Sequence, residues 1–391
     1  MNINSLNILV VLQVIGHPRD SKRIAMLQQA GFIVEAVAFE RDYHVGRNPD
    51  CKVELLRKIT PGRYLQRILK MVTALPKMRR AVKRNHIVYA SGQDVAFMAL
   101  IAGWGLGKPV VLEVGDIRKL QVASGLKGCL VRTVDKYFVN ACSLLIATAS
   151  GFVDTYYRRW LKVSVPAMII ENKLEQSFVK EIDLEEISRD LKGRPLVDRP
   201  LRIGYFGLLR CEWSWNVLEA LAIARPQGVE IVLAGYPLKP IDLHERSEKL
   251  SNVEFLGEFH SPQDLPALYG DVDLVWGCYP YPDPGDWNWR WARTNRFYES
   301  CFFQKPIITL AGSGDAGEVE RYNIGLIIND QDVQKAADTL CSVKYHDLEN
   351  WKENMSILPR KVYVYTTETE ELKRALEVVA KDREYIKNQQ R

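Results

Sequence analysis

The chain has 391 residues, of which 47% are hydrophobic and 26% charged, a balance typical of a folded protein of two or three domains. Its seven cysteines are scattered and odd in number, and neither they nor the six histidines have metal-ligand spacing, so we expect reduced thiols and no metal site. No apolar run reaches the roughly 18 residues of a membrane span, and the apolar stretch near residue 10 is typical of a strand rather than a signal peptide.

The charge is distributed unevenly along the chain. Residues 1–165 carry 25 basic and 11 acidic side chains, a net charge of +14, whereas residues 166–391 carry 28 basic and 37 acidic, a net charge of −9. Such asymmetry indicates two modules, the first of which faces a polyanion or an anionic surface.

Short apolar runs alternate with helical patterns through the first half. Strands are predicted at 7–15, 32–39, 86–91, 109–116, 144–150 and 167–172, and helices at 21–31, 94–107 and 151–161. Asp20 or Ser21 is the expected cap of the first helix. Near-continuous apolar strands separated by helices indicate a parallel sheet covered on both faces.

The stretch from residue 57 to residue 84 contains ten basic residues and no acidic one, interleaved with apolar side chains and interrupted by Pro76. This basic amphipathic pattern favours an anionic membrane surface, although a solvated basic helix face would give the same pattern. The membrane-facing residues are expected to be Arg63, Arg67, Lys70, Arg79, Arg80, Lys83 and Arg84. We expect no nucleic-acid partner, because the chain has no recognisable nucleic-acid module.

The α/β pattern restarts after a charged segment at 175–200, which we interpret as a linker. Strands are predicted at 201–207, 229–235, 252–257, 272–279 and 306–312 and near 326, with helices at 216–225, 262–270, 295–304 and 332–343 and a last one at 367–390. The predicted domains are therefore 1–174 and 201–358, followed by a C-terminal segment, 359–391, that could pack back on the first domain.

Residues 286–300, DWNWRWARTNRFYES, combine aromatic and polar side chains. A helix is expected to start at Thr294 or Asn295, and its free N–H groups, with Arg296, would bind a phosphate. The alternation of Trp287, Trp289 and Trp291 suggests a strand with all three rings on one face. Those rings either stack on a sugar or pack inside the protein.

Other candidate residues follow predicted strands. Gly207 would let the backbone approach a diphosphate, and Arg210 would neutralise its charge. No G-x-G-x-x-G pattern is present, so a dinucleotide cofactor is not expected. Asp116 ends a strand, where it is either a general base or a helix cap. The loop after the first strand holds three residues that could contact an acceptor or donor phosphate, namely His17, Arg19 and Lys22.

Taken together, several segments resemble the GT-B glycosyltransferases, specifically the family 4-like group of bacterial cell-surface glycan biosynthesis. They are HPRDSKRIAMLQQAGFIVEAVAFER, PVVLEVGD, IIEN, RIGYFGLLR, VEFLGEFHSPQDLPALYGDVDLVW, NRFYESCFFQKPIITL and NIGLII, which span nearly the whole chain. The resemblance implies two doubly wound Rossmann-like domains facing a central cleft. It also implies that the second domain binds a nucleotide-sugar donor and the first an acceptor.

The resemblance also implies roles for individual residues. Glu299 matches the family's ribose-binding glutamate, and Asp116 matches an aspartate that in some members is a general base. The donor-binding set is expected to be Gly207, Arg210, Arg293, Asn295, Arg296, Tyr298 and Glu299. The sequence departs from the family's E-x7-E pattern, because Trp291 stands where the earlier glutamate is usual, which leaves the donor sugar open.

We therefore expect a glycosyltransferase that moves a sugar from a nucleotide sugar to a lipid-linked or glycan acceptor in cell-surface polysaccharide biosynthesis. It would need no cofactor or metal, and would act as a peripheral protein at the cytoplasmic face of the plasma membrane. Two alternatives stay open. A non-hydrolysing nucleotide-sugar epimerase has the same two-domain shape, and a non-catalytic glycan-binding protein would account for the missing glutamate.

Overall fold

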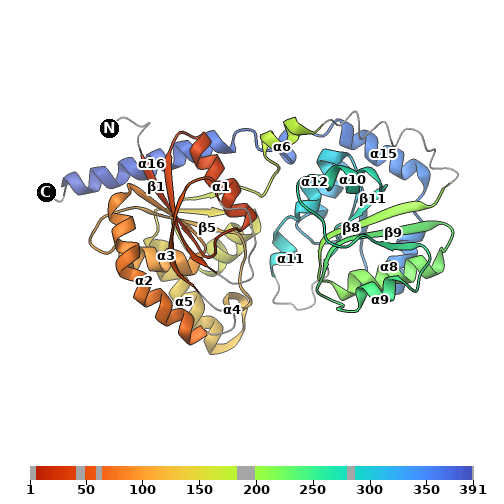
Figure 1. Cartoon of the computed structure of the whole chain (residues 1–391), viewed down its shortest axis with the longest axis horizontal. Helices are drawn as coiled ribbons and strands as arrows, with labels where there is room; N and C mark the ends of the chain where they lie inside the picture. Colours follow the sequence, from red (N-terminus) through yellow and green to blue (C-terminus); the bar gives the residue numbers. More distant parts are fainter. Residues whose placement is uncertain (1–5, 41–48, 59–63, 183–198, 280–286, 390–391) are drawn as a thin grey trace. The chain divides into compact units, whose positions relative to one another are not determined.

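A computed structural model of the chain describes residues 6–40, 49–58, 64–182, 199–279 and 287–389, and the chain divides into two compact units (Figure 1). Unit 1 comprises Met1–Asn172 and Thr367–Arg391, and unit 2 comprises Lys173–Thr366. Each unit is built on one parallel sheet, as the apolar strand pattern predicts.

In the described part of unit 1, seven strands pair in the order β3-β2-β1-β4-β5-β6-β7. They are β1 (Asn7–Leu12), β2 (Ile33–Glu40), β3 (Lys52–Lys58), β4 (Ile87–Ser91), β5 (Val110–Val114), β6 (Leu144–Ala147) and β7 (Ala167–Ile169). The helices are α1 (Pro18–Gln29), α2 (Tyr64–Arg84), α3 (Gln93–Ala102), α4 (Lys119–Val122), α5 (Gly125–Ala141), the π-helix η2 (Phe152–Trp160) and α16 (Glu368–Gln389).

The helices of unit 1 lie in two layers. Helices α1 and α16 contact each other on one face of the sheet, and α2, α3 and α5 cover the other face (Figure 1). Helix α16 buries Leu372, Leu376 and Val379, so the last helix is part of the hydrophobic core of unit 1. The strand order reverses between β1 and β4, which brings the carboxyl ends of β1, β4 and β5 together, the usual place for a ligand in such sheets.

Three details of unit 1 differ from the sequence predictions. Helix α1 is capped at His17 and not at Asp20 or Ser21, because Pro18 is already suited to a first helical position. Arg57 and Lys58 belong to strand β3 rather than to the basic helix. Helix α2 continues through Pro76, which is exposed, so water can hydrogen-bond the carbonyl that the proline leaves without a partner.

Unit 2 has, among its described residues, six parallel strands in the order β10-β9-β8-β11-β12-β13. They are β8 (Leu201–Leu209), β9 (Val229–Pro237), β10 (Val253–Phe255), β11 (Leu274–Trp276), β12 (Ile307–Leu310) and β13 (Gly325–Ile328). The helical elements are α6 (Gln176–Glu181), α8 (Glu212–Ala224), α9 (Leu243–Ser247), α10 (Leu265–Gly270), α11 (Trp287–Trp291), α12 (Asn295–Phe303), α13 (Ala316–Tyr322), α14 (Val333–Cys341), α15 (Tyr345–Ser356) and the 3₁₀ turn η4 (Arg360–Val362).

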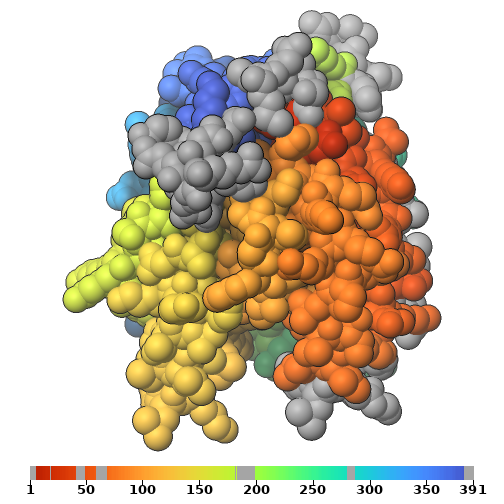
Figure 2. Space-filling model, turned by 90° about the vertical axis from the view of Figure 1, so that its left-hand side faces the viewer, coloured from red at the N-terminus to blue at the C-terminus, as the bar shows by residue number. Residues whose placement is uncertain are grey.

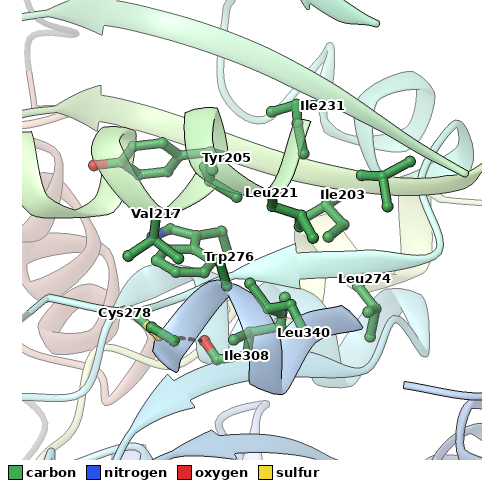
Figure 3. Close-up of a cluster of buried hydrophobic side chains, with 14 of the residues drawn as sticks. Ile203, Tyr205, Val217, Leu221, Ile231, Leu274, Trp276, Cys278, Ile308 and Leu340 are labelled. Atoms are coloured by element: carbon green, nitrogen blue, oxygen red, sulfur yellow. Dashed lines mark hydrogen bonds between the residues drawn. The ribbon is translucent and has the colours of Figure 1, made fainter. Parts of the chain in front are cut away.

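The core of unit 2 reaches up to the carboxyl ends of its central strands. Tyr205 and Trp276 pack in one hydrophobic cluster, together with Cys278, whose thiol lies 3.5 Å from the carbonyl oxygen of Ile308 (Figure 3). The loop that leaves β11 therefore starts from a rigid, buried base. Of the predicted linker 175–200, residues 175–182 belong to unit 2, where Phe178 packs against Phe302, and residues 183–198 lie outside the described residues.

Candidate functional site

The carboxyl end of β8 carries the first group of candidate residues. Gly207 has a φ of +100°, a conformation that favours glycine, and a side chain added there would lie 3.7 Å from the guanidinium of Arg296. Gly235 of the neighbouring strand approaches Gly207 so closely that a Cβ at Gly235 would be 1.8 Å from the Gly207 carbonyl oxygen. The two glycines thus let the backbones of β8 and β9 approach closely, directly beside an arginine.

Arg296 is buried, and its guanidinium is fixed by uncharged groups. Its Nε donates to the carbonyl of Phe206, one terminal nitrogen lies 3.5 Å from the carbonyl oxygen of Trp276, and the other donates to the hydroxyl of Tyr279. These contacts use three of the five N–H groups of an arginine. No carboxylate of the described residues forms an ion pair with it, and burial lowers the pKa of Arg296 because the charged form is desolvated.

A second arginine, Arg210, lies near the same tyrosine and near Trp289. The guanidinium of Arg210 lies 5.0 Å from the ring centre of Trp289 and 5.6 Å from that of Tyr279, whose ring is also 4.7 Å from the guanidinium of Arg296. Trp289 meets Tyr279 edge to face at 4.6 Å. We call these four residues, Arg210, Tyr279, Trp289 and Arg296, the arginine–aromatic cluster. It places two cations at the carboxyl ends of β8 and β11, the kind of surface that binds an anion.

The three tryptophans do not form the strand that their alternation suggests. They lie on the short helix α11, where Trp287 and Trp291 are four residues apart and stack at 4.7 Å. Trp289 therefore points in another direction, toward Tyr279 and Arg210. Only this tryptophan of the three is part of the arginine–aromatic cluster, so the expected strand with all three rings on one face is wrong.

Helix α12 begins where the sequence predicts. Its N-cap is Thr294, whose hydroxyl accepts a hydrogen bond from the Phe297 amide at 3.2 Å and donates one to the carboxylate of Asp315 at 2.7 Å. The Thr294 amide also lies 3.2 Å from Asp315, which is buried. Burial raises the pKa of Asp315 to about 7, because the hydrogen bonds from Thr294 only partly offset the loss of hydration.

This carboxyl group predicts a pH dependence of stability. With a pKa raised from 3.8 to about 7 in the folded state, Asp315 contributes stability that is complete below pH 4 and is lost as the pH rises to 7. The shift of about 3 pH units corresponds to roughly 4 kcal/mol of unfolding free energy. We expect Asp315→Asn to remove most of the decline between pH 4 and 7, measured by urea unfolding as the difference from the wild type. A decline of unchanged slope in the variant would contradict the assignment.

Glu299 lies one turn into α12 and is partly exposed. Its Oε2 accepts a hydrogen bond of 2.7 Å from the hydroxyl of Tyr269, which is fully buried, so the carboxylate has a fixed direction. Tyr298, by contrast, is buried in the hydrophobic cluster beside Phe297, and the structure gives it a packing role instead of the expected donor contact. Arg293 forms an ion pair with Glu318 at 3.1 Å, and Asn295 is exposed at the first turn of α12.

In unit 1 the candidate residues follow the carboxyl ends of β1 and β5. Arg19 lies against Gly115, so closely that a Cβ at Gly115 would be 1.2 Å from its guanidinium, and Asp116 is the next residue, exposed. His17 is exposed at the helix cap, and Lys22 is half-buried on α1. Gly115 therefore appears as a positioning residue that sequence reasoning missed, since its lack of a side chain makes room for Arg19.

Buried charged residues hold β5 and the start of α1 in position. Glu113 of β5 forms a two-point ion pair with Arg23 at 2.9 and 3.0 Å and accepts a hydrogen bond of 2.5 Å from Tyr89. These partners hold the pKa of Glu113 below its usual range against the effect of burial. Asp20 accepts from the hydroxyl of Ser91 at 2.6 Å. The arrangement fixes the start of α1, and with it Arg19, relative to β5.

The basic helix α2 uses several of its cations within the protein. Arg79 donates to two backbone carbonyls, of Ala102 at 2.7 Å and Trp104 at 2.8 Å, and Arg84 pairs with Glu54 at 3.1 Å. Lys70 donates to the carbonyl of Lys58. Arg80 and Lys83 are exposed and have no ion-pair partner among the described residues. Arg63 lies outside the described residues, as does the side chain of Arg67.

The described residues contain no cluster of acidic, histidine or cysteine side chains with the geometry of a metal site. Within the same residues, no helix is both long and apolar enough to cross a bilayer.

Comparisons with known proteins agree on the fold. No family model matches the sequence. The succinoglycan biosynthesis protein ExoL of Rhizobium meliloti is 28% identical over 351 residues, covering 86% of this chain and 84% of ExoL. The crystal structure of Anabaena Alr3699/HepE with UDP superposes with a TM-score of 0.71 at 17% identity, covering 95% of this chain and 100% of that one. Sucrose-phosphate synthase from Thermosynechococcus elongatus gives a TM-score of 0.64 at 15% identity, covering 98% of each chain.

The GT-B fold expected from the resemblance is thereby confirmed: the chain has two α/β units, each built on one parallel sheet, and it matches these structures over nearly its whole length.

Proposed function

We propose that the chain is a glycosyltransferase of polysaccharide biosynthesis that takes a sugar from a nucleotide-sugar donor bound to unit 2. The observation that carries the proposal is Arg296, a buried cation that forms no ion pair with a described residue, beside the edge of the sheet at Gly207. Burying an unpaired charge is costly unless another group supplies the counter-charge. A diphosphate bound at this edge is such a group.

Two further residues of unit 2, Arg210 and Glu299, would bind the diphosphate and the ribose of a nucleotide-sugar donor. Arg210 would stabilise the charge that develops on the diphosphate as the glycosidic bond breaks. Glu299, held by Tyr269, could accept hydrogen bonds from both ribose hydroxyls. A uridine nucleotide is the first choice, because HepE was solved with UDP and with UDP-glucose. Two arginines would neutralise the diphosphate, so we propose a metal-independent reaction with no cofactor.

Unit 1 would receive the acceptor. Asp116, exposed at the end of β5, would orient or deprotonate the acceptor hydroxyl, and Arg19 would contact an acceptor phosphate. We propose a lipid-linked or glycan acceptor, which the kinship with a succinoglycan biosynthesis protein supports. The described cysteines are free thiols, which suits the cytoplasmic side of the plasma membrane, where we place the reaction.

The test is nucleotide release from UDP-, GDP-, dTDP- and ADP-sugars, with and without a bacterial membrane lipid extract and with and without EDTA. We expect release from one donor, UDP-sugar first, that increases with the extract and is unaffected by EDTA. Conversion of a donor to an isomeric nucleotide sugar without any extract would show an epimerase instead. Glycan binding with neither release nor isomerisation would show a non-catalytic protein.

A further inference from the structure

Helix α5 of unit 1 exposes an apolar stripe along its outer side. The stripe consists of Leu126, Leu130, Val134 and Tyr137, which recur at helical spacing. Leu126 is 90% exposed, Leu130 65% and Tyr137 73%, values far above those of leucines that a helix buries in a core. A water-soluble surface helix normally has the opposite arrangement. An exposed apolar stripe of this kind, within the described residues of unit 1, marks an interaction surface.

The inner side of α5 explains why the leucines face outward. Its buried residues are Gly128, Asp135 and Val139. The carboxylate of Asp135 accepts hydrogen bonds of 2.7 Å from both Gln121 and Tyr156, which come from α4 and η2. A buried carboxylate with two such partners fixes the rotation of the helix, because turning it would leave the charge without hydrogen bonds.

Neighbouring elements extend the apolar surface. Leu120 of α4 is half exposed, Trp104 after α3 is 80% exposed, and α2 exposes its own apolar group near its start, namely Ile68, Leu69 and Val72. Helix α3 contacts both α2 and α5, and the three helices cover the same face of the sheet, so the exposed apolar residues of α2 and α5 belong to one layer of helices. Figure 2 shows α2 in orange, α3 in lighter orange and α5 in yellow side by side on the surface.

The charge around the stripe identifies the kind of partner. Residues 117–141 contain five basic side chains and one acidic side chain, which is the buried Asp135. Lys127 and Lys136 of α5 are exposed beside the stripe, as are Arg80 and Lys83 of α2. A second copy of the chain would bring like charges together here, whereas an anionic lipid surface complements both the charge and the apolar side chains. Tyrosine and tryptophan suit the level of the lipid headgroups.

We propose that α5 is an in-plane membrane anchor, whose stripe enters the headgroup region of an anionic bilayer while Lys127 and Lys136 contact lipid phosphates. The inference names the membrane-binding element of the proposed function, and it rests on that function only for the location of the acceptor. It also assigns the main membrane contact to α5 rather than to α2. That helix contributes Arg80, Lys83 and its apolar start, but Arg79 and Arg84 are already bound within the protein.

The test is flotation of the full-length chain with vesicles of phosphatidylcholine alone or mixed with phosphatidylglycerol. We expect binding to the mixed vesicles, at least tenfold weaker binding for Leu126→Glu/Leu130→Glu and for Lys127→Glu/Lys136→Glu, and little binding to phosphatidylcholine alone. The matched control is Ile223→Glu/Ile241→Glu, which changes two exposed isoleucines of unit 2 and should leave flotation unchanged.

Three results would overturn the inference. They are wild-type binding by the leucine variant, equal binding to both kinds of vesicle, and a lipid-free dimer that the leucine variant dissociates, which would assign the stripe to a second copy. Urea unfolding, measured in every variant, reports folding independently of lipid. Vesicle binding through α5 in a chain that releases no nucleotide would refute the proposed transferase and leave the anchor standing.

Discussion

Arg296→Met is expected to abolish measurable nucleotide binding while leaving the unliganded protein folded. Methionine retains most of the volume of the arginine stem but removes the charge and the terminal donors. Loss of charge-assisted hydrogen bonds to a phosphate, about 1.5–3 kcal/mol each, predicts at least a 100-fold weaker affinity for UDP. In contrast, no acidic partner of the described residues would be left alone in the core, so the cost to stability should stay below the roughly 3–5 kcal/mol of a broken buried ion pair.

The measurement pairs calorimetric titration of UDP with urea unfolding of the unliganded variant. Arg246→Met is the matched control, since Arg246 also lies over an aromatic ring, that of Trp215, but is paired with Glu219 on the outer part of unit 2. We expect the control to lose stability and keep its affinity. If Arg296→Met binds UDP normally, the arginine serves only to hold the loops after β8 and β11, and the diphosphate site must be sought elsewhere.

Much of the fold could be predicted because the strands are buried on both faces. The run Ile8–Leu12 is apolar throughout, and Val110–Val114 is interrupted only by the buried, ion-paired Glu113, which excludes a one-sided sheet and makes helical connections necessary. Among the elements that escaped prediction, β3 and α5 did so for identifiable physical reasons. Strand β3 is an edge strand with mostly exposed residues, so it lacks the apolar run. Helix α5 has its apolar side outward, so the usual rule that apolar residues mark the buried face of a helix would predict the wrong face.

The candidate site was predicted only where a local rule applies. The cap at Thr294 follows from residue type, and Gly207 and Asp116 follow from their places after apolar strands. Tyr279 contacts Arg210, which follows β8, and Arg296 of α12. These segments are far apart in sequence, so no local pattern predicts the contacts. Likewise, the alternating tryptophans fit both a strand and a helix with a tryptophan pair at four-residue spacing. Three tryptophans are too few to distinguish the period of a strand from that of a helix.

Glu299→Ala and Glu299→Gln are expected to weaken UDP binding by at least 100-fold and by about tenfold, respectively. The carboxylate can accept from two vicinal hydroxyls at once, whereas a glutamine amide offers one neutral acceptor, and alanine offers none. The matched variant is Tyr269→Phe, which removes only the 2.7 Å hydrogen bond that directs Glu299 and keeps the buried ring. That bond is worth about 1 kcal/mol, which corresponds to a severalfold loss.

A series of nucleotides separates ribose recognition from a general loss of structure. If Glu299 binds the ribose, wild-type affinity should fall from UDP to 2′-deoxy-UDP, and Glu299→Ala should bind the two nucleotides equally. Tyr269→Phe should keep part of the preference, because its carboxylate is present but less well directed. An alanine variant that still prefers UDP over the deoxy form would place the ribose on another residue. A carboxylate that merely stabilised α12 would instead lower the affinity for both nucleotides in equal proportion, so the ratio of the two affinities decides the role of this residue.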